Sequence, residues 1–368
     1  MASGSRFSAG TAVPARLGWS RTRPLDTDND GVRTNGQAVR LWLGALGAAA
    51  LVMGLGAARS PAVTPKIGGC PIFPAFKGSA TARSGANQSA WNQNVSKAPV
   101  DPRSGHYIAR ITSLGGNQVV HPDFGGNGVY GIPYTTVGRH QRRVQVNVTG
   151  YPDQSDFGRA PIPPGAPVEG GSDRHVLVLQ RHRCDLFEMY AAHYVGGHGH
   201  RWNAGSTARF NLHSTRLRHD GWTSADAAGL SILAGLVRPG EVRRGHVRHA
   251  IRVTFEETRR AYIHPATHYA SDLCDPDLPP MGLRLRLSHS YFHHNLHRFP
   301  AGSQSRVIFK ALYHYGIINA DNGGTGANWF ITGARSKRWH DGDLNRLKTV
   351  PGTAFVVVDS RARVRTPC

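Results

Sequence analysis

The chain has 368 residues, enough to bury a large core, and its 39% apolar and 18% charged residues exclude an intrinsically disordered protein. A formal charge of +21 suits an anionic polymer as partner. The basic residues are scattered, however, and no zinc-finger, helix-turn-helix or RNP-like pattern is present, so we expect no specific nucleic-acid binding.

The amino-terminal region reads as a targeting segment. Residues 1–40 have the composition of a disordered leader, and the run Leu41–Ala58 is apolar and uncharged between Arg40 and Arg59. It predicts a signal sequence or a single membrane-spanning segment, and these two alternatives stay open. In both cases the rest of the chain lies outside the cytoplasm, anchored to the membrane through residues 41–58 if they are not cleaved.

The segment 59–105 is rich in Gly, Ser, Ala, Pro and Asn, which predicts a linker or extended arm, and a β-rich exported domain follows at 106–368. Four cysteines lie beyond the targeting segment: Cys70, Cys184, Cys274 and Cys368. In an exported chain they permit two disulfides with three possible pairings. None forms a CxxC pair, so zinc-ribbon chemistry is not indicated.

Strand patterns dominate the folded region. Val144, Val146 and Val148 alternate with polar residues, while His175–Leu179 and Leu186–Tyr190 predict a hairpin. Further strands are expected at Ala208–Leu212, Val247–Phe255, Leu283–Leu287, Trp329–Thr332 and Ala354–Val358. With 44 glycines and 23 prolines to make turns, the chain is predicted to be mainly β, a β-sandwich or related β-rich domain with a few helical decorations.

Two helices are expected. Thr223–Asp226 resembles a helix start with a capping side chain, and a second helix begins near Ser303 with an apolar stripe that includes Val307 and Leu312. Gly316 predicts the end of this second helix.

The candidate catalytic residues are acids and histidines near strand ends. Glu169, Asp173 and His175 lie in a glycine-containing turn directly before an apolar strand, where burial and neighbouring charges can shift pKa values. On an extended chain Asp173 and His175 would point to the same side and form an orienting pair. His249 and Asp321 are added as further acid/base candidates, although a core histidine and a turn carboxylate are the simpler explanations for them.

Aromatic residues supply candidate substrate contacts. Asn328 and Trp329 place an amide beside an indole, a pairing that suits a sugar ring and its hydroxyls, and Trp202 and Trp222 could extend such a platform.

Long motifs from Gly131 onward resemble a family of exported bacterial proteins of unassigned function. They are GIPYTTV, the EGGSDRHVLV run, DGWTSADAAGL, LPPMGLRLRL and the ADNGG and NWFI segments. Some relatives carry a label that suggests nucleotide binding. This chain has no GxxxxGK[ST] and no GxGxxG between a strand and a helix, so we reject that label.

The stretch Ser288–Phe299 contains four histidines: His289, His293, His294 and His297. In the resembled family this stretch is a polar, mostly non-histidine turn. If it were helical, His293 and His297 would share a face at a spacing that zinc can use. No Glu or Asp lies within the stretch to orient an imidazole. We therefore predict a solvated loop without a metal, and no cofactor for the chain.

These observations favour an exported envelope protein that is a carbohydrate-active enzyme, with a carboxylate and histidine acid/base site acting on a polysaccharide or other anionic polymer. The alternative is a non-catalytic cell-envelope or glycan-binding module with the same fold. The enzyme and binding-module hypotheses can be distinguished by the structure: catalysis requires Glu169 or Asp173 to lie in one cleft with His249 or Asp321. The sequence leaves the oligomeric state open.

Overall fold

The computed structural model describes residues 65–72, 89–122, 124–125, 130–197, 199–324, 326 and 328–368. The chain divides into two units, Met1–Ser60 and Pro61–Cys368, and all described residues belong to the second. The predicted leader and the apolar run Leu41–Ala58 lie outside the described residues. Among the residues that are described, no helix has the length and apolar character needed to cross a membrane.

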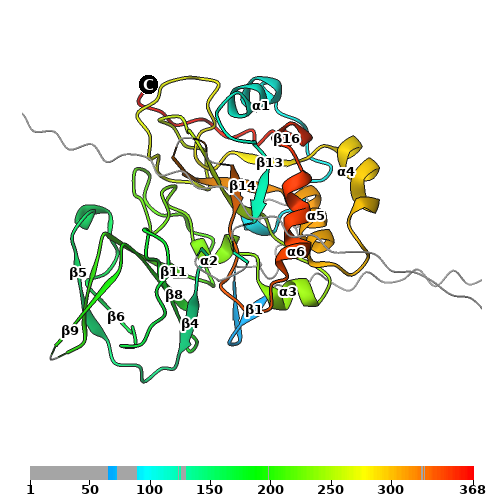
Figure 1. The fold of residues 1–368 in the computed structure, drawn as a ribbon. Coiled ribbons are helices and arrows are strands. Elements are labelled where there is room, and N and C mark those ends of the chain that lie inside the picture. Colours follow the sequence, from blue (N-terminus) through cyan, green and yellow to red (C-terminus); the bar gives the residue numbers. More distant parts are fainter. Residues whose placement is uncertain are drawn as a thin grey trace, which may run out of the picture. The chain divides into compact units, whose positions relative to one another are not determined.

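The prediction of a β-rich fold with few helices is confirmed, because the described residues form four sheets (Figure 1). The smallest sheet pairs β1 (Lys66–Ile67) with β2 (Cys70–Pro71). A second, in the order β6-β5-β10-β9, contains β5 (Val144–Val148), β6 (Arg159–Ala160), β9 (His193–Gly196) and β10 (Arg201–Ala204). A third, in the order β11-β8-β7-β4, contains β4 (Tyr134–Val137), β7 (Val176–Gln180), β8 (Asp185–Tyr190) and β11 (Ser206–Asn211).

The largest sheet has six strands in the order β16-β13-β14-β12-β15-β3. Its members are β3 (Val120–Pro122), β12 (Ile251–Phe255), β13 (Arg284–Leu287), β14 (Ile317–Asn322), β15 (Trp329–Ile331) and β16 (Phe355–Val357). Every strand region expected from the sequence contains a strand, and β7 pairs with β8 as the predicted antiparallel hairpin.

The two four-stranded sheets pack face to face as a sandwich. Val144 and Val146 of β5 and Trp202 of β10 share one apolar core with Val178 of β7 and Phe187 of β8. The alternation of β5 follows from this packing, because only one of its faces meets the core.

Strand β7 is buried on both faces, which explains its continuous apolar run. Its second face, with Leu177 and Leu179, packs against α2 (Ile232–Gly235) and against Ile318 and Ala320 of β14. The sandwich and the six-stranded sheet therefore share a second core, and the cluster of charged groups described below lies beside it.

The opposite face of the six-stranded sheet carries helices. Ile317 of β14 and Val253 of β12 belong to a third core that includes side chains of α1 (Ser104–Thr112), α4 (His289–Asn295) and α5 (Gln304–His314). The shorter helices are α3 (Pro239–Arg243), α6 (Asp341–Leu344) and the 3-10 turns η2 (Ala90–Asn92), η3 (Pro152–Gln154), η4 (Leu296–Arg298), η5 (Asn345–Thr349) and η6 (Gly352–Ala354).

The helix expected near Ser303 is confirmed as α5. The Ser303 side chain accepts a hydrogen bond from the backbone N–H of Arg306 and so caps the first turn. Gly316, with φ +69°, lies just beyond the end of the helix. A Cβ at this position would come to 2.0 Å from the carbonyl oxygen of Leu285, so both the backbone conformation and the close packing require glycine.

Two local predictions were wrong. Thr223–Asp226 starts no helix; it is part of a buried loop, and α2 begins only at Ile232, capped by Ser231. The histidine-rich stretch is not a loop, because His289–Asn295 form α4, whose Phe292 stacks on Phe309 and Tyr313 of α5. In both places tertiary packing decided the local conformation.

The described pieces of the predicted linker pack tightly. Cys70, Ile72, Trp91 and Val95 are all buried. The pairing that the sequence left open is Cys70 with Cys184 and Cys274 with Cys368. The first bridge fastens residues before the sandwich to the β7–β8 turn. Two disulfides are consistent with an oxidising or extracellular environment.

Candidate functional site

A cluster of charged side chains lies where the third sheet meets the six-stranded sheet. It contains four of the five acid/base residues expected from the sequence, Glu169, Asp173, His175 and Asp321, together with Asp226 and Arg252. We call these six residues the acidic cluster. They come from the turn before β7, the buried loop 223–231, the middle of β12 and the end of β14.

Glu169 and His175 form a buried ion pair. The His175 Nδ1 atom lies 2.5 Å from a Glu169 carboxylate oxygen, and its Nε2 atom lies 3.0 Å from the carbonyl oxygen of Ala225. Burial disfavours both charges, but the hydrogen bond and the mutual attraction outweigh it, so the pKa of Glu169 is lowered and the pKa of His175 is raised. Because both ring nitrogens face acceptors, the protonated ring satisfies both.

Arg252 joins two further carboxylates. Its Nε donates to Asp226, and its Nη2 lies 2.7 Å from a carboxylate oxygen of Asp321. Burial lowers the pKa of Arg252, but the two carboxylates outweigh this and raise it above its usual value. The Asp321 side chain is 23% exposed, whereas Asp226 is fully buried. Arg252 thus connects the interior of the cluster to its solvent-facing side.

Asp173 lies at this solvent-facing side and is half-buried. Burial raises its pKa, and the negative charges of Asp321 and Glu169 raise it further, against the opposing effect of His175 and Arg252. Burial also raises the pKa of Tyr190, which ends β8, with contributions from Asp173 and Asp321. Four carboxyl groups share two cations here, which disfavours the ionised form of Asp173, the acid on the solvent-facing side.

The backbone around Asp173 is unusual. Arg174 has φ +48° and Ala191 has φ +49°, a left-handed conformation that side chains other than glycine rarely adopt. The Ala191 N–H donates to the Asp173 carbonyl over 2.8 Å, which ties the turn to the end of β8. Since the chain is not extended at Arg174, the expected pairing of Asp173 with His175 was wrong, and Glu169 is the hydrogen-bonding partner of His175.

His249 belongs to a different buried group. Its Nε2 atom lies 3.3 Å from Glu241 and 3.0 Å from the Arg238 guanidinium, and its Nδ1 contacts the carbonyl oxygen of Ala250. The side chain is fully buried between α3 and β12. This placement fits the simpler interpretation, a core histidine, better than an acid/base role.

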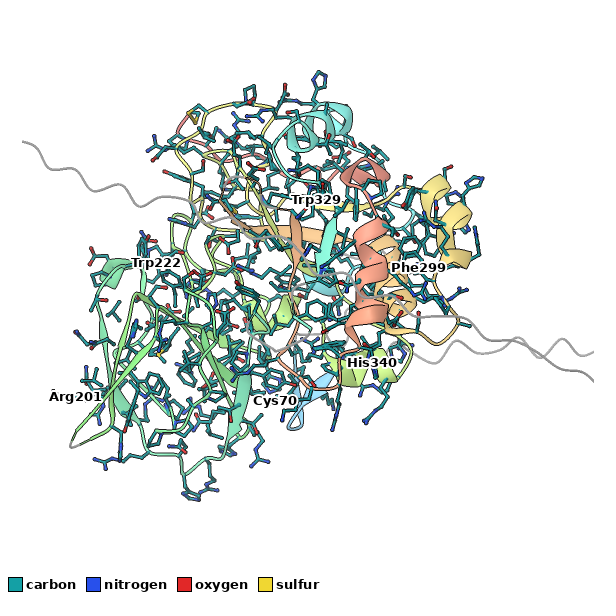
Figure 2. The ribbon with its side chains drawn as sticks, viewed as in Figure 1. Cys70, Arg201, Trp222, Phe299, Trp329 and His340 are labelled. Carbon is teal, nitrogen blue, oxygen red and sulfur yellow. A yellow bond between two sulfur atoms is a disulfide. The ribbon has the colours of Figure 1, made fainter. Side chains whose placement is uncertain are left out.

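The predicted aromatic platform is not formed. Trp202 and Trp329 are 1% and 0% exposed and pack in separate cores, so these two assignments were wrong: an amphipathic indole in a strand fills a core as readily as it binds a sugar. Trp329 also donates from Nε1 to Gln118, and Asn328 precedes it in the chain. Figure 2 shows Trp222 far from Trp329, and Trp222 alone is partly exposed.

Among the residues that the structure describes, no group of three or more His, Cys, Asp or Glu is arranged to hold a metal ion. The His289 and His293 rings lie 4.2 Å apart on α4, and both contact the ring of Tyr313. These histidines therefore pack on the α4–α5 surface.

The sequence interpretation missed Asp226 and Arg252. A signal for Arg252 was present, because an arginine in the apolar strand Ile251–Phe255 must find a carboxylate when that strand is buried. Asp226 was interpreted as part of a helix start, and only the fold shows that it faces Arg252.

No family model, curated protein or solved structure matches the chain. The function of the chain is therefore inferred from the geometry of the acidic cluster.

Proposed function

We propose that the protein is a carbohydrate-active enzyme that cleaves a polysaccharide, with Asp173 as general acid and Asp321 as the second carboxylate. The observation that carries the proposal is the convergence of a half-buried acid of raised pKa and an arginine-bound carboxylate from distant segments. Acid/base cleavage of a glycosidic bond needs one proton donor and one ionised carboxylate, whose environments separate their pKa values.

The roles follow from exposure. Asp173 would protonate the leaving oxygen of the glycosidic bond, and Asp321, held by Arg252, would act as base or nucleophile. Arg252, Glu169 and His175 are 8% exposed or less and act as positioning residues.

Exposed tyrosines near the cluster would bind sugar rings. Tyr130 is 59% exposed and lies beside Gly171 of the turn that carries Asp173. Tyr151 is 46% exposed and contributes to the raised pKa of Tyr190. Exposed aromatic rings near the acidic cluster are suited to the apolar faces of sugars.

The test incubates the purified protein with a panel of bacterial polysaccharides and measures release of reducing ends. Asp173→Asn is expected to lower the rate about 100-fold or more, the usual contribution of a general acid. The matched control is Asp185→Asn at the opposite end of β8, where the carboxylate pairs with Arg209; it should retain the rate. A panel without cleavage, but with binding, would favour a glycan-binding module instead.

We also propose that residues 41–58 direct export, which the disulfides and the family resemblance support. Deleting this segment should retain the protein in the cytoplasm with reduced cysteines. Secretion or membrane anchoring independent of the segment would contradict the proposal.

A further inference from the structure

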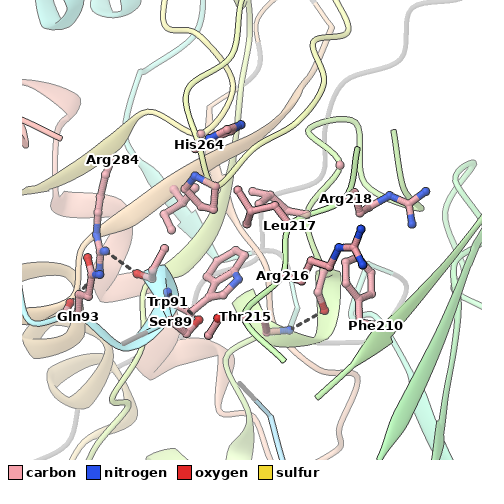
Figure 3. Close-up of a pocket in the computed structure, with 18 of the residues that line it drawn as sticks. Ser89, Trp91, Gln93, Phe210, Thr215, Arg216, Leu217, Arg218, His264 and Arg284 are labelled. Atoms are coloured by element: carbon pink, nitrogen blue, oxygen red, sulfur yellow. Dashed lines mark hydrogen bonds between the residues drawn. The ribbon is translucent and has the colours of Figure 1, made fainter. Parts of the chain in front are cut away.

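A large groove lies apart from the residues of the acidic cluster. Its volume is about 1410 Å³, more than a single sugar ring needs. One wall is formed by the end of β11 and the residues after it, within 209–222; another contains His264 and Pro265, and the turn at residues 89–98 also lines it. Figure 3 shows Trp91 in the middle of the groove, between Arg284 on one side and Phe210 and Arg216 on the other.

The groove carries an excess of positive charge. Four arginines line it, against two aspartates. Of these, Arg218 pairs with Asp156 and also stacks over the rings of Phe210 and Trp222 at 5.9 and 5.7 Å. Arg216 is exposed on the same wall, and no carboxylate among the described residues forms an ion pair with its side chain.

Arg284 adds a buried cation. It is 8% exposed, and its guanidinium donates to the carbonyl oxygens of Ala90, Gln93 and Tyr315. Burial lowers the pKa of Arg284 to about 9, so it remains charged at neutral pH. Its hydrogen-bond partners in the described residues are carbonyls, which leave the positive charge unneutralised and make the groove attractive to an anion.

The polar wall suits a hydroxylated ligand. Asn211, Ser214 and Thr215 present amide and hydroxyl groups beside Arg216. The indoles offer little open face, because Trp91 is 6% exposed and Trp222 is covered by Arg218 and by the His219 ring at 5.0 Å. Base stacking in single-stranded nucleic acid needs open aromatic faces, so the lining favours a sugar over a nucleobase.

We propose that this groove binds an acidic oligosaccharide, with Arg216 contacting the carboxylate of a uronic acid. The inference names a substrate class and rests on the proposed function in taking the ligand to be a polysaccharide. The binding site itself is separate from the acidic cluster.

The experiment titrates the full chain carrying Asp173→Asn, in which cleavage should be slowed about 100-fold or more, with a galacturonate hexamer, its methyl-esterified counterpart and a thymidine oligonucleotide. The acidic hexamer should bind, and the neutral ester should bind about tenfold more weakly. Adding Arg216→Ala should weaken binding of the acidic hexamer about tenfold, since one charge-assisted hydrogen bond is lost. Arg216→Glu should abolish binding.

The control is Arg139→Ala, an exposed arginine between β4 and β5, which should leave the affinity unchanged. An equal loss in both alanine variants, no binding of the acidic hexamer, or tighter binding of the oligonucleotide would overturn the inference. Arg216-dependent binding without cleavage by the unmutated protein would overturn only the proposed function, and cleavage without such binding would overturn only the groove.

Discussion

Two buried ion clusters in this protein have similar members and different surroundings. The acidic cluster around Arg252 and the group of Arg238, Glu241 and His249 each combine an arginine, a histidine and carboxylate. In the second group every side chain is 5% exposed or less, whereas Asp321 of the first is 23% exposed. Residue types alone therefore do not identify a site; access to solvent separates the two.

The charge balance differs as well. Glu241 faces both Arg238 and His249. Burial would raise the pKa of Glu241, but these neighbours outweigh burial and lower the pKa to about 2. In the acidic cluster four carboxyl groups share two cations, and the pKa of Asp173 is raised. The group around Glu241 therefore keeps its carboxylate ionised, whereas the acidic cluster disfavours the ionised form of Asp173.

Removal of the cation of the acidic cluster should have the largest effect on stability. Arg252→Met leaves Asp226 buried without its partner and should lower the free energy of unfolding by about 3–5 kcal/mol. Urea unfolding at pH 7 measures this. Arg209→Met, which removes a partly exposed partner of Asp185, is the matched control and should cost less than about 1 kcal/mol. Equal losses would show that burial of Arg252 has no special role.

Acid should lower the stability contributed by the group of Arg238, Glu241 and His249. Since the pKa of Glu241 is about 2 in the folded protein and near 4.5 when unfolded, this group contributes roughly 3 kcal/mol above pH 4.5. That stability is lost as the pH falls through 2. Urea unfolding between pH 2 and 5 should show a shallower acid dependence for Glu241→Gln than for the unmutated chain. An unchanged slope would contradict the assignment.

Glu188 is a buried carboxyl group whose partners are neutral hydrogen-bond donors instead of a cation. It accepts hydrogen bonds from Ser231 and from the N–H groups of Ile232 and Leu233, and burial raises its pKa to about 7. A carboxyl with a raised pKa stabilises the fold most below pH 4.5. We expect a loss of at most roughly 3 kcal/mol as the pH rises from 4.5 to 7.

The measurement for Glu188 is the free energy of unfolding across this pH range. Glu188→Gln should flatten the decline, while Glu257→Gln, at a partly exposed site, should preserve it. A decline identical in all three proteins would assign it to other groups.

The smallest expected effect on stability concerns Asp173. Because the fold raises the pKa of Asp173, the ionised carboxylate is less favourable in the folded than in the unfolded chain, and Asp173→Asn should change stability by less than about 1 kcal/mol, in the stabilising direction. Thermal and urea unfolding measure this beside the activity assay. A large destabilisation would mean that Asp173 serves the fold rather than a reaction.

Much of the strand content could be predicted because each pattern reflects a local environment. The alternation of apolar and polar residues in Val144–Val148 indicates a strand with one buried face. The continuous apolar run after His175 indicates a strand that is buried on both faces. The start of α5 could be predicted from Ser303, because the hydrogen bond that caps the helix joins residues only three positions apart. The helix predicted to start at Thr223–Asp226 is not formed. The same residue types that cap helices also occur in buried loops, and here the distant Arg252 binds the Asp226 carboxylate.

The amino-acid sequence alone predicts that this chain builds strands, locates the turn with Glu169, Asp173 and His175, and shows which cysteines are available for pairing. Hydrophobic period and turn chemistry act over a few residues, so they can be recognised along the chain. The folded arrangement was needed to show that Asp321 and Arg252 join that turn, that His249 does not belong to the acidic cluster, and that Trp202 and Trp329 are core residues. Those outcomes depend on charge balance and burial between segments far apart in sequence.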